Sequence, residues 1–209
     1  VSEGNVCFDE GRKRIALDNV RIRSETQSSS DELILTHGNR HNLEAIMGLT
    51  FSEPRMHDCD VTPSFSPGAK SYYQRIQEGQ LFDFVVARLS AIPESKKGVV
   101  VFPTYEDYKQ VSGNMKDDYL PCLVSVQFRL VQNSGGEYDL NTTCNFRSMD
   151  VFQKGHGNLV AIAMMTELIS VRIGDNLGVQ VMPGFLDGLI VDAHIYENTI
   201  EDAKTLIHI

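Results

Sequence analysis

The chain has 209 residues, with 19 Lys and Arg against 28 Asp and Glu, so its formal net charge is −9. Binding along a nucleic-acid backbone needs a net basic surface, so this acidic balance argues against a general nucleic-acid binder but not against a small anionic ligand. Apolar residues make up 42% of the sequence, and its apolar runs are too short to span a membrane, which predicts a globular domain.

Four cysteines lie at positions 7, 59, 122 and 144, with no Cys-x-x-Cys pair and no spacing typical of zinc ligands. This usage predicts neither a metal site nor a disulfide framework, and a reducing, cytoplasmic location is expected. In such a chain, a cysteine with a chemical role is expected to act as a nucleophile.

The first third of the chain carries the weakest signals of regular structure. The polar stretch 23–32 (RSETQSSSDE) predicts a mobile loop, and the segment 52–70, which holds three prolines, predicts a second loop. No repeat or long linker divides the sequence, so we expect one domain over 1–209.

From residue 80 onward the elements are better defined. Apolar residues at helical spacing predict a helix over 81–89, and the run 98–102 (GVVVF) predicts a buried strand. Alternating residues over 123–131 predict a half-buried strand. Its apolar face carries Val124, Val126, Phe128 and Leu130.

The remaining elements mix strands and helices. A turn signal at 133–136 (NSGG) joins the preceding strand to a second strand over 137–146, as an antiparallel hairpin. Residues 158–173 are apolar around most of a helical surface, which predicts a central helix. A buried strand over 188–196 and a helix over 199–207 follow. This order predicts an α+β fold rather than a regular βαβ series.

Two groups of polar residues flank the predicted hairpin. Cys122 follows a proline at its entry and is either a nucleophile or an inert buried side chain. Arg147, Ser148 and Asp150 follow the hairpin, and Asn158 opens the predicted central helix. Taken alone, Asn158 is most simply an N-cap, and Arg147 with Asp150 a surface ion pair.

A third polar group lies on the predicted strand 188–196. Side chains two residues apart on a strand share a face, so Asp192, His194 and Tyr196 point the same way. Polar groups on an otherwise apolar strand need partners, which either a ligand or a buried network can supply. The pattern favours neither source.

In this order, the three groups resemble the thymidylate synthase superfamily. The matching motifs are Pro-Cys at 121–122, Arg-Ser-x-Asp at 147–150, the Asn at 158 and Asp-x-His-x-Tyr at 192–196. The resemblance covers roughly 80–206, the expected catalytic core, whereas residues 1–79 match poorly. It implies a large mixed sheet flanked by helices, with two chains packed through their sheets as a homodimer.

The resemblance also implies a chemistry on a pyrimidine nucleoside monophosphate, with 5,10-methylenetetrahydrofolate as one-carbon donor. Cys122 would add to C6 of the ring and make C5 nucleophilic. Arg147 would hold the phosphate and favour the thiolate, and Ser148 would add a hydrogen bond to the phosphate. Asn158 would match the O4 and N3–H edge of uracil, whereas an Asp there would suit cytosine better. Asp150 would lie near the pterin.

Other site residues follow from the resemblance more loosely. His194 and Tyr196 would bind the sugar hydroxyl of either ribose or deoxyribose. Lys96 and Lys97 replace paired arginines that reach the phosphate in the neighbouring subunit, although lysine lacks the bidentate fork of arginine. A solvated pair of loop charges is the alternative. Glu44 is a loose match to the catalytic glutamate of the family.

The sequence departs from the family pattern at several points. The stretch GHGN at 155–158 replaces a small-Pro-Phe-Asn approach, so His156 is either a new site base or a loop residue without a role. Trp is absent, and the sequence given ends at Ile209, before the family's closing segment. Closure and aromatic shielding keep water from the reacting group, so these departures favour a hydroxymethyl over a methyl product.

The sequence therefore predicts C5 one-carbon transfer to a uridylate, dUMP or UMP. A cytidylate hydroxymethylase acting on CMP or dCMP is one alternative. A catalytically silent nucleotide-binding protein with the same fold is another, of a different class. No nucleic-acid or membrane partner is expected.

Overall fold

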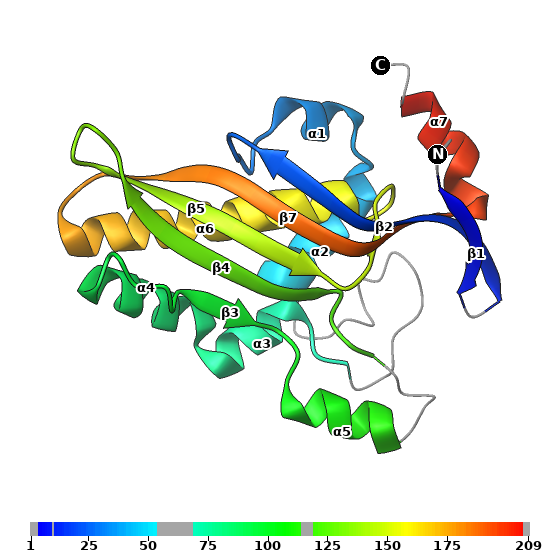
Figure 1. Ribbon diagram of the computed structural model, residues 1–209, viewed down its shortest axis with the longest axis horizontal. Helices are drawn as coiled ribbons and strands as arrows, with labels where there is room; N and C mark the ends of the chain where they lie inside the picture. Colours follow the sequence, from blue (N-terminus) through cyan, green and yellow to red (C-terminus); the bar gives the residue numbers. More distant parts are fainter. Residues whose placement is uncertain (1–3, 10, 54–68, 114–118, 207–209) are drawn as a thin grey trace.

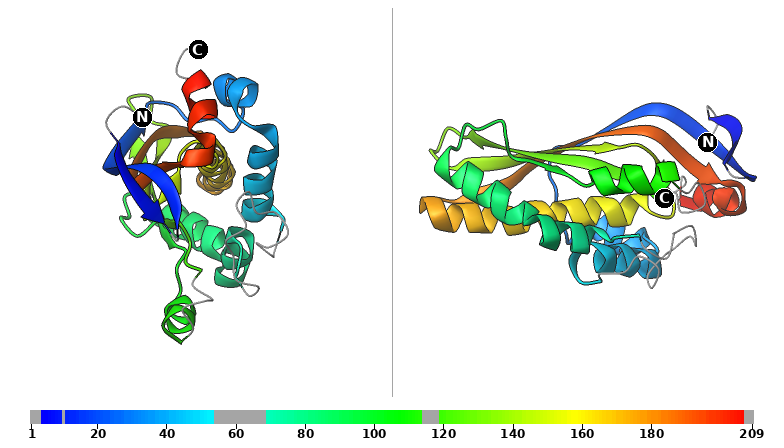
Figure 2. Two further views of the ribbon diagram at one scale, coloured as in Figure 1. Left: turned by 90° about the vertical axis from the view of Figure 1, so that its right-hand side faces the viewer. Right: turned by 90° about the horizontal axis from the view of Figure 1, so that it is seen from below.

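The computed structural model describes residues 4–9, 11–53, 69–113 and 119–206. Seven strands form one sheet, and helices α4 and α6 run along one of its faces (Figures 1 and 2). The strands are β1 (Asn5–Asp9), β2 (Arg12–Ser24), β3 (Val99–Val101), β4 (Leu123–Gln132), β5 (Tyr138–Phe146), β6 (Met149–Asp150) and β7 (Val181–Tyr196). The helices are α1 (Glu32–His37), α2 (Arg40–Phe51), α3 (Tyr72–Gly79), α4 (Leu81–Ala91), α5 (Tyr105–Gly113), α6 (Gly155–Leu177) and α7 (Ile200–Leu206).

The sheet is mixed, which confirms the predicted α+β class. Its order is β1-β2-β7-β5-β4-β3, with the short β6 paired beside β7. Strand β5 runs parallel to β7, because the long α6 returns the chain to the end of the sheet at which β5 begins. Strand β4 runs antiparallel to β5. The start of β4 and the ends of β5 and β7 therefore lie at one end of the sheet.

The core lies between the sheet and its helices. Alternate residues of β4 and β5 point into it, and the buried side of α6 packs against them. Among the largest fully buried side chains are Phe128, Phe146, Leu140, Ile162, Met165 and Ile169. The opposite face of the sheet is open and carries mainly polar side chains on β4 and β5, such as Arg129 and Thr143.

The predicted elements after residue 80 are confirmed, with shifted ends. The β4–β5 hairpin and α4 form where expected. In β4 a register irregularity between Leu123 and Ser125 turns Leu123 into the core, so the predicted alternation holds only from Val126 onward. Helix α6 begins at Gly155, three residues before the predicted start, and β7 extends seven residues further towards the N-terminus than predicted.

The expectation of an irregular first third is wrong. Strand β2 is 13 residues long and pairs with β7, and β1 joins it through a turn at Gly11, whose φ is +82°. The predicted mobile loop 23–32 comprises the end of β2, a connection and the start of α1. In that connection Gln27 donates to the Gly184 carbonyl at 3.2 Å. Most of the second predicted loop, 52–70, lies outside the described residues.

The strand β2 escaped prediction because its side chains do not alternate between apolar and polar. One face of β2 is open to solvent, and the other meets polar groups of β7 rather than the core alone.

Helix α6 is long and apolar enough to span a membrane by length and composition alone. Of its most apolar 18-residue window, 56% is buried inside the molecule, as in the core helix of a globular domain. Its start follows β6 after the turn 151–154, so the first turn of α6 lies close to the sheet end where β4 begins.

Candidate active site

Cys122, Arg147 and Ser148 meet at the sheet end defined above, and we call them the thiol cluster. Cys122 immediately precedes β4 and is half-buried, and its backbone carbonyl accepts a hydrogen bond from the Arg147 amide at 2.9 Å. The Ser148 hydroxyl donates to the Cys122 sulfur at 3.6 Å. The two motifs, 26 residues apart, are thus joined by neighbouring strands of one hairpin.

The Arg147 side chain holds the segment that precedes Cys122. Its Nε donates to the Pro121 carbonyl at 3.2 Å and its Nη2 to the Leu120 carbonyl at 2.7 Å, while Nη1 lies 3.4 Å from the Ser148 hydroxyl. A guanidinium has about five N–H groups, one on Nε and two on each terminal nitrogen. The three bonds above use one N–H on each nitrogen, so one N–H remains on Nη1 and one on Nη2. Two such donors on an exposed guanidinium suit a phosphate oxygen pair.

Two tyrosines that the sequence interpretation missed lie beside the thiol cluster. The buried Tyr72 hydroxyl accepts a hydrogen bond from the Leu123 amide at 3.0 Å. Burial and the nearby Cys122 raise the pKa of Tyr72, and burial together with Tyr72 and Cys122 raises the pKa of Tyr119. Both phenols therefore stay protonated near neutral pH. Nothing in the local sequence signals this contact, because Tyr72 lies 51 residues from Leu123.

A buried ion pair holds the helix that carries Tyr72. The Arg75 guanidinium contacts the Asp107 carboxylate through two hydrogen bonds of 2.6 and 2.8 Å, and Nη1 also donates to the Phe102 carbonyl at 2.9 Å. The Thr104 amide donates to the same carboxylate at 2.6 Å. This pair fixes α3, and through it Tyr72, against the chain that leads from β3 to α5.

The face shared by Asp192, His194 and Tyr196 is confirmed, and we call these three residues the hydroxyl cluster. His194 Nδ1 lies 2.7 Å from Asp192 Oδ1, and the same oxygen is bonded to Arg14 of β2. Although burial opposes it, the bonds from Arg14 and His194 hold the pKa of Asp192 below its ordinary value. The cluster therefore finds protein partners on the neighbouring strand.

Tyr196 finds its partners on the β1–β2 hairpin. Its hydroxyl donates to Asp9 Oδ2 at 2.7 Å and accepts from Arg12 Nη2 at 3.0 Å. The Arg12 guanidinium also lies over the ring, 4.2 Å from its centroid. Burial and the bond to Asp9 raise the pKa of Tyr196. Sequence analysis missed Asp9, Arg12 and Arg14, since it did not predict β2.

Asp150 lies on β6, directly opposite His194 of β7 and two residues after Ser148 in the sequence. It is buried, and its two carboxylate oxygens accept from the Gln153 amide at 2.9 Å and from Gln153 Nε2 at 2.8 Å. The alternative of a surface ion pair between Arg147 and Asp150 is therefore wrong.

Asn158 is not an N-cap, because α6 starts at Gly155 after Lys154. Asn158 lies in the first turn, and its Nδ2 donates to the Lys154 carbonyl at 2.9 Å. One amide N–H and the side-chain oxygen remain available. No hydrogen bond joins Asn158 to the thiol cluster within the described chain.

Glu44 and His156 are not brought to the thiol cluster. Glu44 lies on the exposed side of α2 and pairs with Arg40 at 2.8 Å. His156 lies in the first turn of α6, where Nε2 is 3.1 Å from the Asn39 carbonyl oxygen. Since a carbonyl only accepts, the ring donates, and His156 joins α6 to the start of α2.

Lys96 and Lys97 lie on the exposed loop before β3 and far from the Cys122 of the same chain. The Gly98 carbonyl that follows them accepts from the Phe128 amide, six residues along β4 from Cys122. At the rise of an extended strand, this separation is roughly 20 Å.

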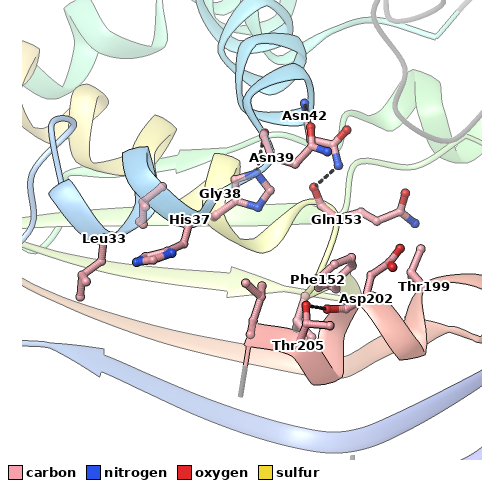
Figure 3. Close-up of a pocket in the computed structure, with 14 residues that line it drawn as sticks. Leu33, His37, Gly38, Asn39, Asn42, Phe152, Gln153, Thr199, Asp202 and Thr205 are labelled. Carbon is pink, nitrogen blue, oxygen red and sulfur yellow. Dashed lines mark hydrogen bonds between the residues drawn. The ribbon is translucent and has the colours of Figure 1, made fainter. Parts of the chain in front are cut away.

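A pocket of about 810 Å³ opens between α1, the start of α2, the turn before α6 and α7 (Figure 3). Asn42 closes one side by donating to the Gln153 carbonyl at 3.1 Å. The thiol cluster does not line this pocket, which reaches the site only through Gln153. Its lining includes Leu33, His37, Asn39, Gln153, His156 and Asp202. Within the described residues, no group of three His, Cys, Asp or Glu side chains could hold a metal ion.

The comparisons with known proteins agree with this geometry. The family model described as thymidylate synthase matches residues 39–208, starting some forty residues before the point from which the motifs resemble the family. The match includes both clusters but not the β1–β2 hairpin. No curated protein matches the sequence. The match supports methylation or hydroxymethylation of pyrimidine nucleotides at C5 as the class of reaction. The chain belongs to the thymidylate synthase family.

Proposed function

We propose that the chain transfers a one-carbon unit to C5 of a uridylate, dUMP or UMP, as a methyl or a hydroxymethyl group. The observation that carries the proposal is the meeting of a thiol, a hydroxyl donor and a guanidinium with two free N–H groups at one sheet end. The hydroxyl cluster lies at the same end on β7, the strand beside β5.

Cys122 is the nucleophile of the proposed reaction. Its thiolate adds to C6 of the uracil ring, the ring electrons move to O4, and C5 becomes nucleophilic. C5 then gains the new carbon and loses its proton to solvent. The C6–S bond breaks, which restores the ring double bond and returns the thiolate of Cys122. The Ser148 hydroxyl, which donates to the sulfur, stabilises the negative charge that forms there when the bond breaks.

Arg147 and Asn158 bind the two ends of the nucleotide. The two N–H groups left on the Arg147 guanidinium bind the phosphate, while its other bonds hold the segment before Cys122. Asn158 keeps one N–H donor and one oxygen acceptor, which match O4 and N3–H of uracil. Cytosine presents the opposite pattern, and we therefore favour a uridylate.

The residues present fit 5,10-methylenetetrahydrofolate as the donor. The Asp150 carboxylate keeps free lone pairs beside its two bonds from Gln153, and pterin N–H groups are donors that a carboxylate accepts. When bound, this folate would supply the one-carbon unit. For a methyl product it would also supply the hydride that reduces this unit, whereas for a hydroxymethyl product water would supply the oxygen.

The exchange of Asn158 tests the base assignment. In Asn158→Asp the carboxylate offers only acceptors, so we expect turnover of UMP and dUMP to fall by about tenfold or more, while CMP and dCMP gain relative to them. Steady-state rates with the four nucleotides measure this change. If Asn158→Asp improves turnover of CMP from a level already above that of UMP, the chain is a cytidylate hydroxymethylase.

Incubation with the folate and each of the four nucleotides tests the reaction itself. The mass of the product distinguishes a methyl from a hydroxymethyl group, and release of tritium from C5 reports attack by Cys122. The exposed position of Glu44 favours the silent nucleotide-binding protein as the second candidate. Nucleotide binding without tritium release would establish that candidate instead.

We also propose a homodimer formed through the open face of the sheet. Lys96 and Lys97 lie too far from their own Cys122 to share its phosphate, so they either reach the phosphate in the site of a partner or are a solvated pair of loop charges. Light scattering should give the mass of two chains, and activity should fall on dilution. A single-chain mass at the working concentration would contradict the dimer.

A further inference from the structure

Tyr196 has no hydrogen left to donate. Its hydroxyl carries one hydrogen, and Asp9, which as a carboxylate can only accept, receives it at 2.7 Å. A guanidinium can only donate, so Arg12 occupies one of the two lone pairs at 3.0 Å. The raised pKa of Tyr196 agrees with a phenol that keeps its proton. The free capacity of this hydroxyl is therefore one lone pair, and it can only accept.

His194 is in the same condition. Asp192 is held as a carboxylate by Arg14, so Nδ1 of the His194 ring carries the hydrogen between them. In the neutral ring, Nε2 is then an acceptor. Among the described residues, only Arg14 Nε and Ser170 Oγ are buried without a partner. The Nε2 atom of His194 has no partner among the described residues and is neither of these, so it keeps some contact with solvent although the residue is largely buried.

Two acceptors therefore lie side by side on β7, with ring centroids 5.0 Å apart. A single hydroxyl has one hydrogen and can donate to only one of them, leaving the other unsatisfied once water is excluded. The adjacent 2′- and 3′-hydroxyls of a ribose carry two hydrogens, one for each acceptor. A 2′-deoxyribose offers only the 3′-hydroxyl.

We propose that His194 and Tyr196 select a ribonucleotide over a deoxyribonucleotide, by accepting one hydrogen bond each from its 2′- and 3′-hydroxyls. This inference rests on the proposed function and on the resemblance, which implies that the sugar lies against these two side chains. The β1–β2 hairpin contributes to the preference, since Asp9 takes the hydrogen that Tyr196 would otherwise donate. This hairpin precedes the segment that matches the family, whereas His194 and Tyr196 lie within it.

Calorimetric titration of the 209-residue chain at about pH 8 tests the proposal with UMP, dUMP and 3′-deoxyuridine 5′-monophosphate. We expect UMP to bind about tenfold or more tighter than either deoxynucleotide, since each of these leaves one acceptor unpaired. CMP and dCMP are titrated in parallel, so that the sugar preference is measured even if the base is cytosine.

The variant Asp9→Ala isolates the cause. It frees the Tyr196 hydrogen, so a lone 3′-hydroxyl can accept from Tyr196 while donating to His194, and the UMP to dUMP ratio should fall towards one. Asp9 is partly exposed on the edge strand β1, and circular dichroism verifies that the variant folds. Glu201→Ala removes an exposed carboxylate on α7 that pairs only with Lys204, and should keep the ratio.

The outcomes separate the inference from the proposed function. If UMP and dUMP bind and react equally well, the sugar preference is wrong and the reaction stands. An unchanged ratio in a folded Asp9→Ala variant also overturns the preference. If none of the nucleotides binds, both the proposed function and the preference fail.

Discussion

The thiol cluster and the hydroxyl cluster lie at the same end of one sheet but are built in opposite ways. The thiol cluster comes from neighbouring strands of one hairpin and is held largely by backbone carbonyls, so its guanidinium keeps free donors. The hydroxyl cluster joins β7 to the other end of the chain, across 187 residues, and the carboxylates of Asp9 and Asp192 accept its hydrogens. The thiol cluster therefore offers hydrogen-bond donors to an anion, whereas the hydroxyl cluster offers acceptors to hydroxyl groups. A nucleoside monophosphate carries both groups.

The largest expected effect concerns the sulfur of the thiol cluster. In Cys122→Ser we expect turnover to fall by at least about a thousandfold, because a serine hydroxyl at this position has no base to activate it. Nucleotide affinity should change little, since Arg147 and the hydroxyl cluster remain. Tritium release from C5 and calorimetry measure the two quantities. Full activity in this variant would show that Cys122 is not the nucleophile, and would contradict the proposed roles of the two clusters.

The second largest expected effect concerns stability and the buried Arg75–Asp107 pair, which holds α3 beside the thiol cluster. Removing one partner of the buried pair in Arg75→Met leaves Asp107 uncompensated, and we expect the free energy of unfolding to fall by about 3–5 kcal/mol. Urea unfolding measures it. Arg40→Met breaks only an exposed pair with Glu44 and should leave stability almost unchanged. The double variant Arg75→Met with Asp107→Leu should recover much of the loss.

The same pair predicts the direction of the acid response. Although burial opposes it, the bonds from Arg75 and Thr104 hold the pKa of Asp107 below its ordinary value. A depressed pKa in the folded state stabilises the fold above the unfolded pKa of about 4, and this contribution is lost as pH falls through the folded pKa. Stability of the wild type should therefore decline below about pH 4, and less steeply in the double variant.

The smallest effect sharpens the contrast between donors and acceptors. Arg147→Lys keeps the charge but not the fork, so it cannot hold the Leu120 and Pro121 carbonyls and still present two donors to a phosphate. We expect nucleotide affinity to fall about tenfold, with the ribose preference unchanged. Arg172→Lys, at an exposed position of α6 where the side chain pairs with Asp83, is the matched control. A change in the ribose preference would show that the two clusters are coupled.

Local periodicity and turn chemistry were enough to predict the β4–β5 hairpin, α4, the central helix and the shared face of residues 192–196. They also placed Cys122 and Arg147 at adjoining ends of one hairpin, because neighbouring strands meet at fixed register. These properties depend on residues close together in the chain, which is why the amino-acid sequence alone determined them.

Only the tertiary structure decided which hydrogen-bond donors and acceptors of each polar group stay free for a ligand. It turned Glu44 to solvent, used one Asn158 hydrogen inside α6 and gave the Tyr196 hydrogen to Asp9. The remaining capacity of a hydroxyl or imidazole depends on partners that a distant strand supplies. That strand, β2, shows no clear period in sequence, since its polar side chains pair with β7 rather than alternate with a core.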